Sequence, residues 1–366
     1  MTEAHGETAG NSFVQQGDFE KITQAVTQEF QVEEALLLQN VPTYYLKQPQ
    51  ETKQPFLRLL KNLEKANMIA FLRRTDGKNV LRIVPKPHVK PSNTRINWIL
   101  LFATIATTFV AGYFSALGLI DPIVGGATFT IAILAVLGTH EMGHKLAANK
   151  KGMEATNPYF IPGPPPFGTF GAVIMQKSLP PNRDALFDIG ADGPIAGFII
   201  ATIVSFFGLM LLIPGPKPSN PDYIQVPLLW TILSRLLQGL NLMPHVVNSQ
   251  TQDLFLHPIT FAGWAGLVVT MLNLLPAGML DGGHVVRSIA GEKVRLVLAG
   301  LSIVFLFIEG FWPMAVLVLF FLSTFKDPGP LDDVSGLSTS RKLAALALVA
   351  IFVLCIFPQI PALPTL

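Results

Sequence analysis

The chain has 366 residues, of which 50% are hydrophobic and only 14% are charged, with a formal net charge of +2. Several charge-free runs reach the roughly 20 residues that a helix needs to cross a bilayer, so the composition excludes an ordinary water-soluble enzyme and predicts a multi-pass membrane protein. The single cysteine, Cys355, excludes an intramolecular disulfide and a thiolate metal cluster, so a metal site has to use histidine and carboxylate ligands.

The first 93 residues hold nearly half of the acidic and basic side chains and are predicted to form a soluble α+β domain with a linker. Apolar residues recur at helical spacing from Asp18 to Phe30 and from Gln54 to Ala66. Asp76-Gly77 then separates two β-prone runs, residues 68–73 and 80–84, which is the signal of a β-hairpin. We therefore expect helices followed by a two-stranded ribbon.

The charges of this domain limit its role. A winged-helix nucleic-acid module has the same order of elements, but basic and acidic residues are nearly balanced, so we expect a protein-contact or regulatory domain and no nucleic-acid partner. Met1 to Gln16 contains no Lys or Arg and no apolar core, which predicts a loose tail rather than a secretory signal or an Arg-rich transit peptide. Pro85, Pro87 and Pro91 predict a stiff basic linker.

Two membrane spans are predicted next, Asn97 to Ile120 and Pro122 to Ala148. Basic residues precede the first span and Asp121 follows it, so the positive-inside rule places the amino-terminal domain in the cytoplasm. Lys150 and Lys151, just beyond the second span, agree with that orientation. The end of the second span is therefore expected near the cytoplasmic face of the membrane.

A His-Glu-x-x-His sequence, His140 to His144, follows a run without charge or histidine that begins at Pro122. On a helix, His140 and His144 point the same way, so their imidazoles can share one metal ion with Glu141 beside it. Zinc accepts imidazole nitrogen and keeps a position for water, which a neighbouring carboxylate can deprotonate. Ionisable groups are costly in an apolar helix and are functional candidates there, so we interpret the motif as a zinc site rather than a coincidence of composition.

The segment 152–188 is rich in proline and contains Gly168-Thr169-Phe170-Gly171, which opens a short β-prone run ending at Met175. Apolar backbone beside a membrane has to find hydrogen-bond partners. One interpretation is a re-entrant strand whose edge pairs with an unwound substrate. The other is a proline-rich connector packed on the helices, and the residues alone leave both open.

A second polar cluster ends the predicted inward span Pro258 to Leu280. Pro276 and Gly278 should break the helix, and a broken helix at membrane depth lines a cavity or is buried in protein. This break places Asp281 as the expected third zinc ligand, on the same side of the membrane as the first motif. His284 and Asp192 are the alternatives for that position.

The remaining apolar runs complete the predicted bundle. Gly193 to Pro216 is a further span, and Leu228 to Leu240, interrupted by Arg235, is an expected interfacial helix. Residues 296–325 would extend about 45 Å as one helix, so two short passes turning at Glu309 to Pro313 are expected, and Leu343 to Phe357 is the last span. The expected fold is a membrane all-α polytopic bundle of about seven transmembrane helices, with six or eight also open. A re-entrant β-strand loop joins this bundle under the first interpretation of segment 152–188. The domains are a small soluble α+β domain over 1–93 and a membrane domain over 94–366.

Residues 94 to about 326 resemble the site-2 protease family of intramembrane zinc metalloproteases. The resemblance rests on His140-Glu141-Met142-Gly143-His144 and on the Asn-x-x-Pro-x-x-x-x-Asp-Gly pattern that starts at Asn273 and includes Asp281. The amino-terminal domain and Pro158-Tyr159-Phe160-Ile161-Pro162 are similar to the cyanobacterial and plastid branch. Family members often show Gly-Pro-x-x-Asn where this chain has Gly193-Pro194-Ile195-Ala196-Gly197, which puts any polar contact from that helix in doubt.

The resemblance implies a role for each motif residue. His140, His144 and Asp281 would ligate Zn²⁺, and Glu141 would act as general base and then as proton donor. Asn273 would hydrogen-bond the substrate or its oxyanion, and the substrate-binding re-entrant strand would include the following residues: Gly168, Thr169, Phe170 and Gly171. Membrane-spanning proteins, such as anti-sigma factors or membrane-tethered regulators, are the implied substrates. Cleavage is expected within the bilayer near the cytoplasmic side. The expected setting, in contact with membrane lipid, is a bacterial plasma or thylakoid membrane.

Two other function classes stay open at this point. A metal-binding transporter or channel could use His and Asp ligands, although it would not need Glu141 beside the first histidine. A membrane zincin acting on prenylated or soluble peptides shares the His-Glu-x-x-His motif but takes a downstream glutamate as third ligand. Glu309 is the later membrane-embedded glutamate, and it is predicted on the opposite face from His140.

Overall fold

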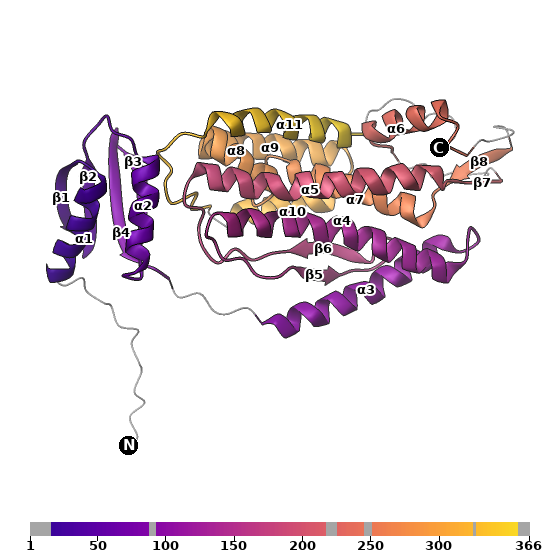
Figure 1. Ribbon diagram of the computed structural model, residues 1–366. Coiled ribbons are helices and arrows are strands. Elements are labelled where there is room, and N and C mark those ends of the chain that lie inside the picture. Colours follow the sequence, from indigo (N-terminus) through magenta and orange to yellow (C-terminus); the bar gives the residue numbers. More distant parts are fainter. Residues whose placement is uncertain (1–15, 88–92, 217–224, 245–250, 325–326, 358–366) are drawn as a thin grey trace, which may run out of the picture. The chain divides into compact units, whose positions relative to one another are not determined.

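The computed structural model describes residues 16–87, 93–216, 225–244, 251–324 and 327–357 (Figure 1). The chain divides into two compact units. The first comprises Met1–Lys90 together with Pro181–Arg183 and Pro330–Gly336, and the second comprises the rest of the chain. The predicted amino-terminal tail up to residue 15, and residues 88–92 of the predicted linker, lie outside the described residues.

The first unit combines two helices, α1 (Gln16–Glu29) and α2 (Lys53–Glu64), with a four-stranded antiparallel sheet of order β1-β2-β4-β3. Its strands are β1 (Val32–Leu38), β2 (Val41–Leu46), β3 (Met68–Thr75) and β4 (Lys78–Pro85). The predicted hairpin at Asp76-Gly77 is confirmed, because Thr75 pairs with Lys78. The expected two-stranded ribbon is wrong, because the β1–β2 hairpin adds two further strands to it.

The outer edge of β3 is paired with a segment from much later in the chain. The N–H of Leu72 donates to the carbonyl oxygen of Leu331 at 2.9 Å, and the N–H of Asp333 donates to the carbonyl oxygen of Leu72 at 3.1 Å. The guanidinium of Arg73 also donates to Leu331, at 2.7 Å. An unpaired edge strand can pair with other chains. The segment 331–333 covers this edge of the sheet and so prevents such pairing.

The second unit is mostly helical, and three of its helices are long and apolar enough to cross a membrane. These are α3 (Thr94–Ala116), α4 (Pro122–Lys150) and α5 (Arg183–Met210). The prediction of about seven spans is not confirmed, because every other helix of this unit has 17 residues or fewer among the described residues. Those helices are α6 (Leu228–Gly239), α7 (Pro258–Leu274), α8 (Asp281–Ala290), α9 (Glu292–Ile308), α10 (Trp312–Thr324) and α11 (Thr339–Cys355).

Two predicted chain breaks are confirmed. Helix α9 ends at Ile308 and α10 begins at Trp312, so the long apolar run turns where it was expected to. Helix α7 ends at Leu274, and α8 begins at Asp281 after a turn in which Gly278 has a φ of 54°. Proline and a left-handed glycine cannot continue a regular helix, so the polar cluster opens a new helix rather than ending the old one.

Helix α5 starts ten residues before the charge-free run that predicted it. Its first turns contain Asp184 and Asp188, and both carboxylates pair with Arg341 at the start of α11, at 3.1 and 2.6 Å. Lys151 lies 2.8 Å from Asp188 as well. The charges are therefore neutralised by partners distant in sequence, which lets the helix begin with acidic residues.

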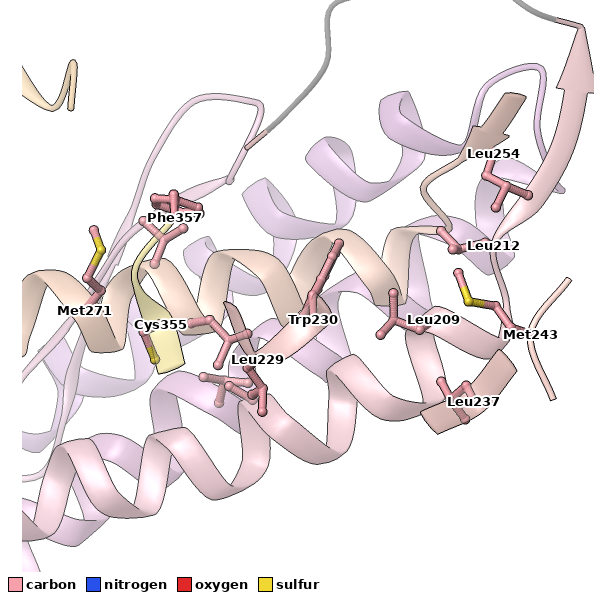
Figure 2. Packing of buried hydrophobic residues seen from close by; sticks show 14 residues of the cluster. Leu209, Leu212, Leu229, Trp230, Leu237, Met243, Leu254, Met271, Cys355 and Phe357 are labelled. Atoms are coloured by element: carbon pink, nitrogen blue, oxygen red, sulfur yellow. The ribbon is translucent and has the colours of Figure 1, made fainter. Parts of the chain in front are cut away.

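The largest buried apolar cluster of this unit gathers side chains from α5, α6, α7 and α11. Figure 2 shows Trp230 of α6 in the middle of the cluster, with Cys355 and Phe357 toward one end and Leu254 toward the other. Trp230 and Cys355 are both fully buried. The cysteine thus packs as a small apolar side chain, and we assign it no chemistry.

The predicted re-entrant strand is a two-stranded hairpin, β5 (Tyr159–Pro162) and β6 (Thr169–Val173), which runs beside α4 and α3 (Figure 1). Beyond the hairpin, the N–H of Met175 donates to the Thr156 hydroxyl and the N–H of Thr156 donates to the Met175 carbonyl, each at 3.0 Å. A second two-stranded antiparallel sheet pairs β7 (Ile213–Pro216) with β8 (Gln252–Phe255), which follows helix α6 in the chain. The β5–β6 hairpin brings irregular chain beside the motif helix.

Candidate metal centre

The two histidines of the His-Glu-x-x-His motif lie on one face of α4. Because they are four residues apart on a helix, their rings lie one turn apart. The rings meet edge to face with centroids 4.8 Å apart, and their Nε2 atoms are 3.0 Å from each other. Both side chains are buried, with 3% of His140 and 6% of His144 exposed. Nδ1 of His144 lies 2.7 Å from the main-chain oxygen of Ile189. A proton on that Nδ1 satisfies the carbonyl and leaves Nε2 with a lone pair for a metal.

Asp281 reaches the same point from the start of α8. Its Oδ2 atom lies 3.2 Å from Nε2 of His140 and 3.3 Å from Nε2 of His144. The turn before it is tight, because a Cβ atom on Gly282 would lie 2.0 Å from the main-chain oxygen of Leu274. Among the described residues, the other candidates for the third ligand, His284 and Asp192, have no ion pair or hydrogen bond to either motif histidine.

The spacing of these three atoms fits a zinc ion. Ligand atoms about 2.0 to 2.1 Å from zinc in a tetrahedral arrangement are about 3.3 Å from one another. The observed separations are 3.0, 3.2 and 3.3 Å, between two imidazole nitrogens and one carboxylate oxygen. Three protein ligands leave a fourth position for water or substrate, which is the composition of a catalytic rather than a structural zinc site.

Three glycines of α5 make room for the three expected ligands. A Cβ atom on Gly193 would lie 2.1 Å from Nε2 of His144, and one on Gly197 would lie 2.9 Å from Nδ1 of His140. A Cβ atom on Gly190 would lie 2.7 Å from the main-chain oxygen of Asp281. The α5 backbone is therefore a wall against which both rings and the aspartate turn are packed. Family members that this chain resembles often have asparagine at position 197. In this chain, glycine at 197 leaves room for the His140 ring.

Glu141 lies beside the histidines and is also buried, with 7% of the residue exposed. Its carboxylate accepts a hydrogen bond from the main-chain N–H of Ile174. Ile174 directly follows β6, so the hairpin and the expected general base are in direct contact. The sequence analysis missed this contact, and the only signal for it was the β-prone run that ends at Met175.

Asn273 also reaches the centre, from the last turn of α7. Its Nδ2 atom lies 3.2 Å from Nε2 of His140. The amide is half-buried and can turn to present either a donor or an acceptor. A donor at this position is within reach of an oxygen held next to His140.

Of the four residues Gly168 to Gly171, Gly168 lies at the tip of the β5–β6 hairpin and the other three begin β6. The Thr107 hydroxyl of α3 donates to the main-chain oxygen of Gly168 at 2.6 Å. Gly168 has a φ of 71°, and a Cβ atom there would lie 2.5 Å from the main-chain oxygen of Thr107, so the close approach requires glycine. Phe167 stacks on Phe261 of α7 with ring centroids 5.7 Å apart. The tip is thus anchored on α3 and α7.

The outer side of β6 is apolar and open. The exposed fraction is 73% for Phe170 and 44% for Val173, and Met175, just beyond the strand, is 60% exposed. Strand β6 pairs with β5 along one edge, and the described residues provide no pairing along its other edge. A strand with a free edge and apolar side chains can accept another extended chain by main-chain hydrogen bonds.

Comparison with known proteins shows what these residues are similar to. Residues 128–308 match the model of peptidase family M50. The chain is 34% identical over 239 residues to a rice protein named probable zinc metalloprotease EGY1, chloroplastic, and 35% identical over 241 residues to its Arabidopsis thaliana namesake. It is 28% identical over 292 residues to the A. thaliana protein named probable zinc metalloprotease EGY2, chloroplastic.

These matches cover more of this chain than of its relatives. The two EGY1 matches cover 62% of this chain but 39% and 42% of the relatives, and the EGY2 match covers 76% of this chain and 51% of the relative. The chain therefore spans about two fifths to one half of the length of these curated proteins. No solved structure matches the chain.

Proposed function

We propose that this chain, whose residues 128–308 match peptidase family M50, is a zinc endopeptidase that cleaves single-span membrane proteins within the bilayer. One observation carries the proposal. Two imidazole nitrogens and one carboxylate oxygen lie within 3.3 Å of one another, at the end of an apolar helix, next to a second buried carboxylate. This set of groups holds a divalent ion and also supplies a base for hydrolysis.

His140, His144 and Asp281 would hold the zinc ion. When bound, zinc would polarise the scissile carbonyl group and lower the pKa of a water molecule. The hydrogen bond from His144 to Ile189 and the packing of both rings on α5 hold the two Nε2 atoms in position, so little reorganisation is needed on binding.

Glu141 would take a proton from the attacking water and then give it to the leaving amine. The N–H of Ile174 would donate to the Glu141 carboxylate and help to orient it. Asn273 would donate its amide N–H to the carbonyl oxygen as negative charge develops there, which is the role of an oxyanion donor. Every group required for peptide hydrolysis thus comes from α4, α7 and α8.

The substrate would lie along β6 as an additional strand. A membrane-spanning helix hides its carbonyl groups in its own hydrogen bonds, so the cleaved segment has to unwind, and substrates with helix-breaking residues are favoured. The free edge of β6 would pair with the unwound segment, and the contact between Ile174 and Glu141 would bring the bond to the base.

Cleavage would take place near the cytoplasmic side of a bacterial plasma or thylakoid membrane, with the amino-terminal unit in the cytoplasm. Lys150 and Lys151 follow the motif at the end of α4, and Arg95 lies in the first turn of α3. Positive residues at these helix ends favour the cytoplasmic side by the positive-inside rule.

The Glu141→Gln variant tests this proposal in the purified full chain, with zinc content and cleavage of a single-span reporter as the two measurements. Because a glutamine side chain keeps the shape of the glutamate but cannot accept the proton, we expect bound zinc at the wild-type level and cleavage lowered at least about 10³-fold. Glu154→Gln, at an exposed position, is the matched control and should retain both.

Three results would contradict the proposal. Cleavage by Glu141→Gln at the wild-type rate would show that Glu141 is not the general base. Metal transport across vesicle membranes that survives the substitution would show that the protein is a transporter. Absence of bound zinc in the wild-type protein would show that these residues do not form a zinc site.

A further inference from the structure

The turn between α7 and α8 sets the direction in which Asp281 enters the metal centre. It comprises residues 275–280 and joins Asn273, in the last turn of α7, to Asp281, the first residue of α8. Within the turn, the N–H of Leu280 donates to the main-chain oxygen of Ala277 at 3.0 Å. Carbonyl groups outside a regular helix need partners from elsewhere, and a buried carbonyl group is costly when it stays unpaired.

Arg295, in the first turn of α9, is such a partner. Its Nη1 atom donates to the main-chain oxygen of Gly278 at 2.8 Å. Its Nε and Nη2 atoms donate to the two carboxylate oxygens of Glu292, at 2.9 and 2.6 Å. Only 3% of Arg295 is exposed. A buried cation has to be paired, and the two parallel hydrogen bonds to one carboxylate hold the planar guanidinium in a single orientation.

The Gly278 carbonyl group lies between this guanidinium and the start of α8. A Cβ atom on Gly283 would lie 2.6 Å from the Gly278 oxygen, so the first turn of α8 packs directly on the carbonyl group. A displacement of the carbonyl group therefore moves the first turn of α8, and Asp281 with it.

The Glu292 carboxylate also reaches the other end of α8. Its Oε2 atom lies 3.2 Å from Nε of Arg287, which is in the last turn of this helix and is 7% exposed. The ten-residue helix is thus held at its start through Gly278 and Arg295, and at its end through Arg287. Both attachments depend on the same pair of residues, Glu292 and Arg295.

We infer that Arg295 is a positioning residue for Asp281. The inference rests on the proposed function, in which Asp281 is a zinc ligand. Arg295 acts through the Gly278 carbonyl group, because no hydrogen bond or ion pair among the described residues joins it to the histidines or to Asp281. Groups that orient a metal ligand typically contribute about 10- to 100-fold to metal affinity or activity. Lysine cannot replace this arginine fully, because an ammonium group lacks the planar fork that bonds two partners at once.

The zinc affinity of Arg295→Gln in the purified full chain, measured by competition with a chelator, tests this inference. Because glutamine has no charge and cannot donate to Gly278 and Glu292 together, we expect zinc to bind about 10- to 100-fold more weakly than in the wild type. The absorption spectrum of Co²⁺ bound in place of zinc should change as well, because it depends on the geometry of the ligands. Lys293→Gln is the matched control, because it removes a positive charge from an exposed position of α9.

Arg295→Lys is the second variant, and it decides the test if Arg295→Gln does not fold. The lysine keeps the charge and can reach one of the two partners, so we expect a zinc affinity between those of the wild type and Arg295→Gln. Hydrogen exchange of the amides of residues 279–284 is measured in zinc-free protein, where faster exchange than in Lys293→Gln is expected for both variants.

The inference is overturned if the folded Arg295 variants bind zinc as tightly as Lys293→Gln. It is also overturned if zinc binding weakens while the Co²⁺ spectrum is unchanged, since that result indicates a general loosening of the fold. In both cases zinc binding and reporter cleavage by the wild type leave the proposed hydrolase untouched. A wild-type chain that binds no zinc would overturn the inference and the proposed function together, and faster exchange in the variants would then assign Arg295 to the fold alone.

Discussion

The metal centre and the β5–β6 hairpin lie next to each other but are built in opposite ways. At the centre, a single methyl group on Gly193 would overlap the His144 ring, and both histidines are buried. On the hairpin, Phe170 is 73% exposed and β6 has a free edge among the described residues. The centre therefore tolerates one arrangement, whereas the hairpin can accept side chains of different size. Under the proposed function, this difference would separate a fixed reaction centre from a variable surface for substrate recognition.

The largest effect should come from removing a ligand at the rigid centre. In Asp281→Asn, the carboxylate that faces both Nε2 atoms becomes neutral, so we expect zinc content to fall more than tenfold and reporter cleavage to reach background. Elemental analysis and the cleavage assay measure these effects. Asp76→Asn makes the same change at the exposed turn of the β3–β4 hairpin and should retain zinc and activity. Full zinc content in Asp281→Asn would show that another residue is the third ligand.

A smaller loss is expected when the centre keeps its metal but loses a donor. Asn273→Ala removes the amide next to His140, and loss of one oxyanion donor typically lowers kcat about 10²- to 10³-fold. Zinc content should stay at the wild-type level. If zinc is lost together with activity, Asn273 supports the fold of the centre rather than the reaction.

The rigidity itself can be broken with one methyl group. Gly193→Ala would push the His144 ring away from its position, and a displacement near 1 Å can cost about 10²-fold in rate. We expect that loss in cleavage, with helix content by circular dichroism unchanged. Gly300→Ala on α9 adds the same methyl where no atom lies within 4 Å and should leave cleavage unaffected. Equal activity of the two variants would mean that the wall of α5 does not position the ligands.

The hairpin should respond more weakly and in a substrate-dependent manner. Phe170→Ala removes an exposed ring from β6, so we expect KM to change about two- to fivefold for some reporters, with kcat and zinc content unchanged. Phe207→Ala, an exposed position on α5, is the control. A large fall in kcat for every reporter would show that the hairpin is part of the rigid centre, and the contrast would not hold.

The sequence was most informative where chemistry demands fixed residue types at fixed spacing. His140 and His144 were recognisable from their four-residue separation, and Asp281 from the Pro276 break that precedes it; the structure brings the three side chains together. Their assignment as ligands remains a prediction. The Ile174 contact to Glu141 could not be foreseen, because a main-chain N–H carries no residue-specific signal.

The missed elements have physical reasons of their own. The β1–β2 hairpin turns at Gln39 and Asn40, both with positive φ, and glutamine is not a residue that signals such a turn. The early start of α5 depends on Arg341, more than 150 positions away, which no local pattern reveals. The predicted number of spans is not confirmed, because apolar runs predict burial, and several of these runs form helices of 17 residues or fewer among the described residues.

The β5–β6 hairpin is held at both ends, by Thr107 at its tip and by the Thr156–Met175 pair beyond β6. A strand fixed in this way keeps its position and does not open and close over the site. A polypeptide paired with it changes faces with each one-residue shift, so it can slide only in steps of two without turning its side chains over. If substrates bind in this manner, the bond that reaches Glu141 is chosen by the phase of the pairing, and a substrate should be cut at one position or at alternate positions.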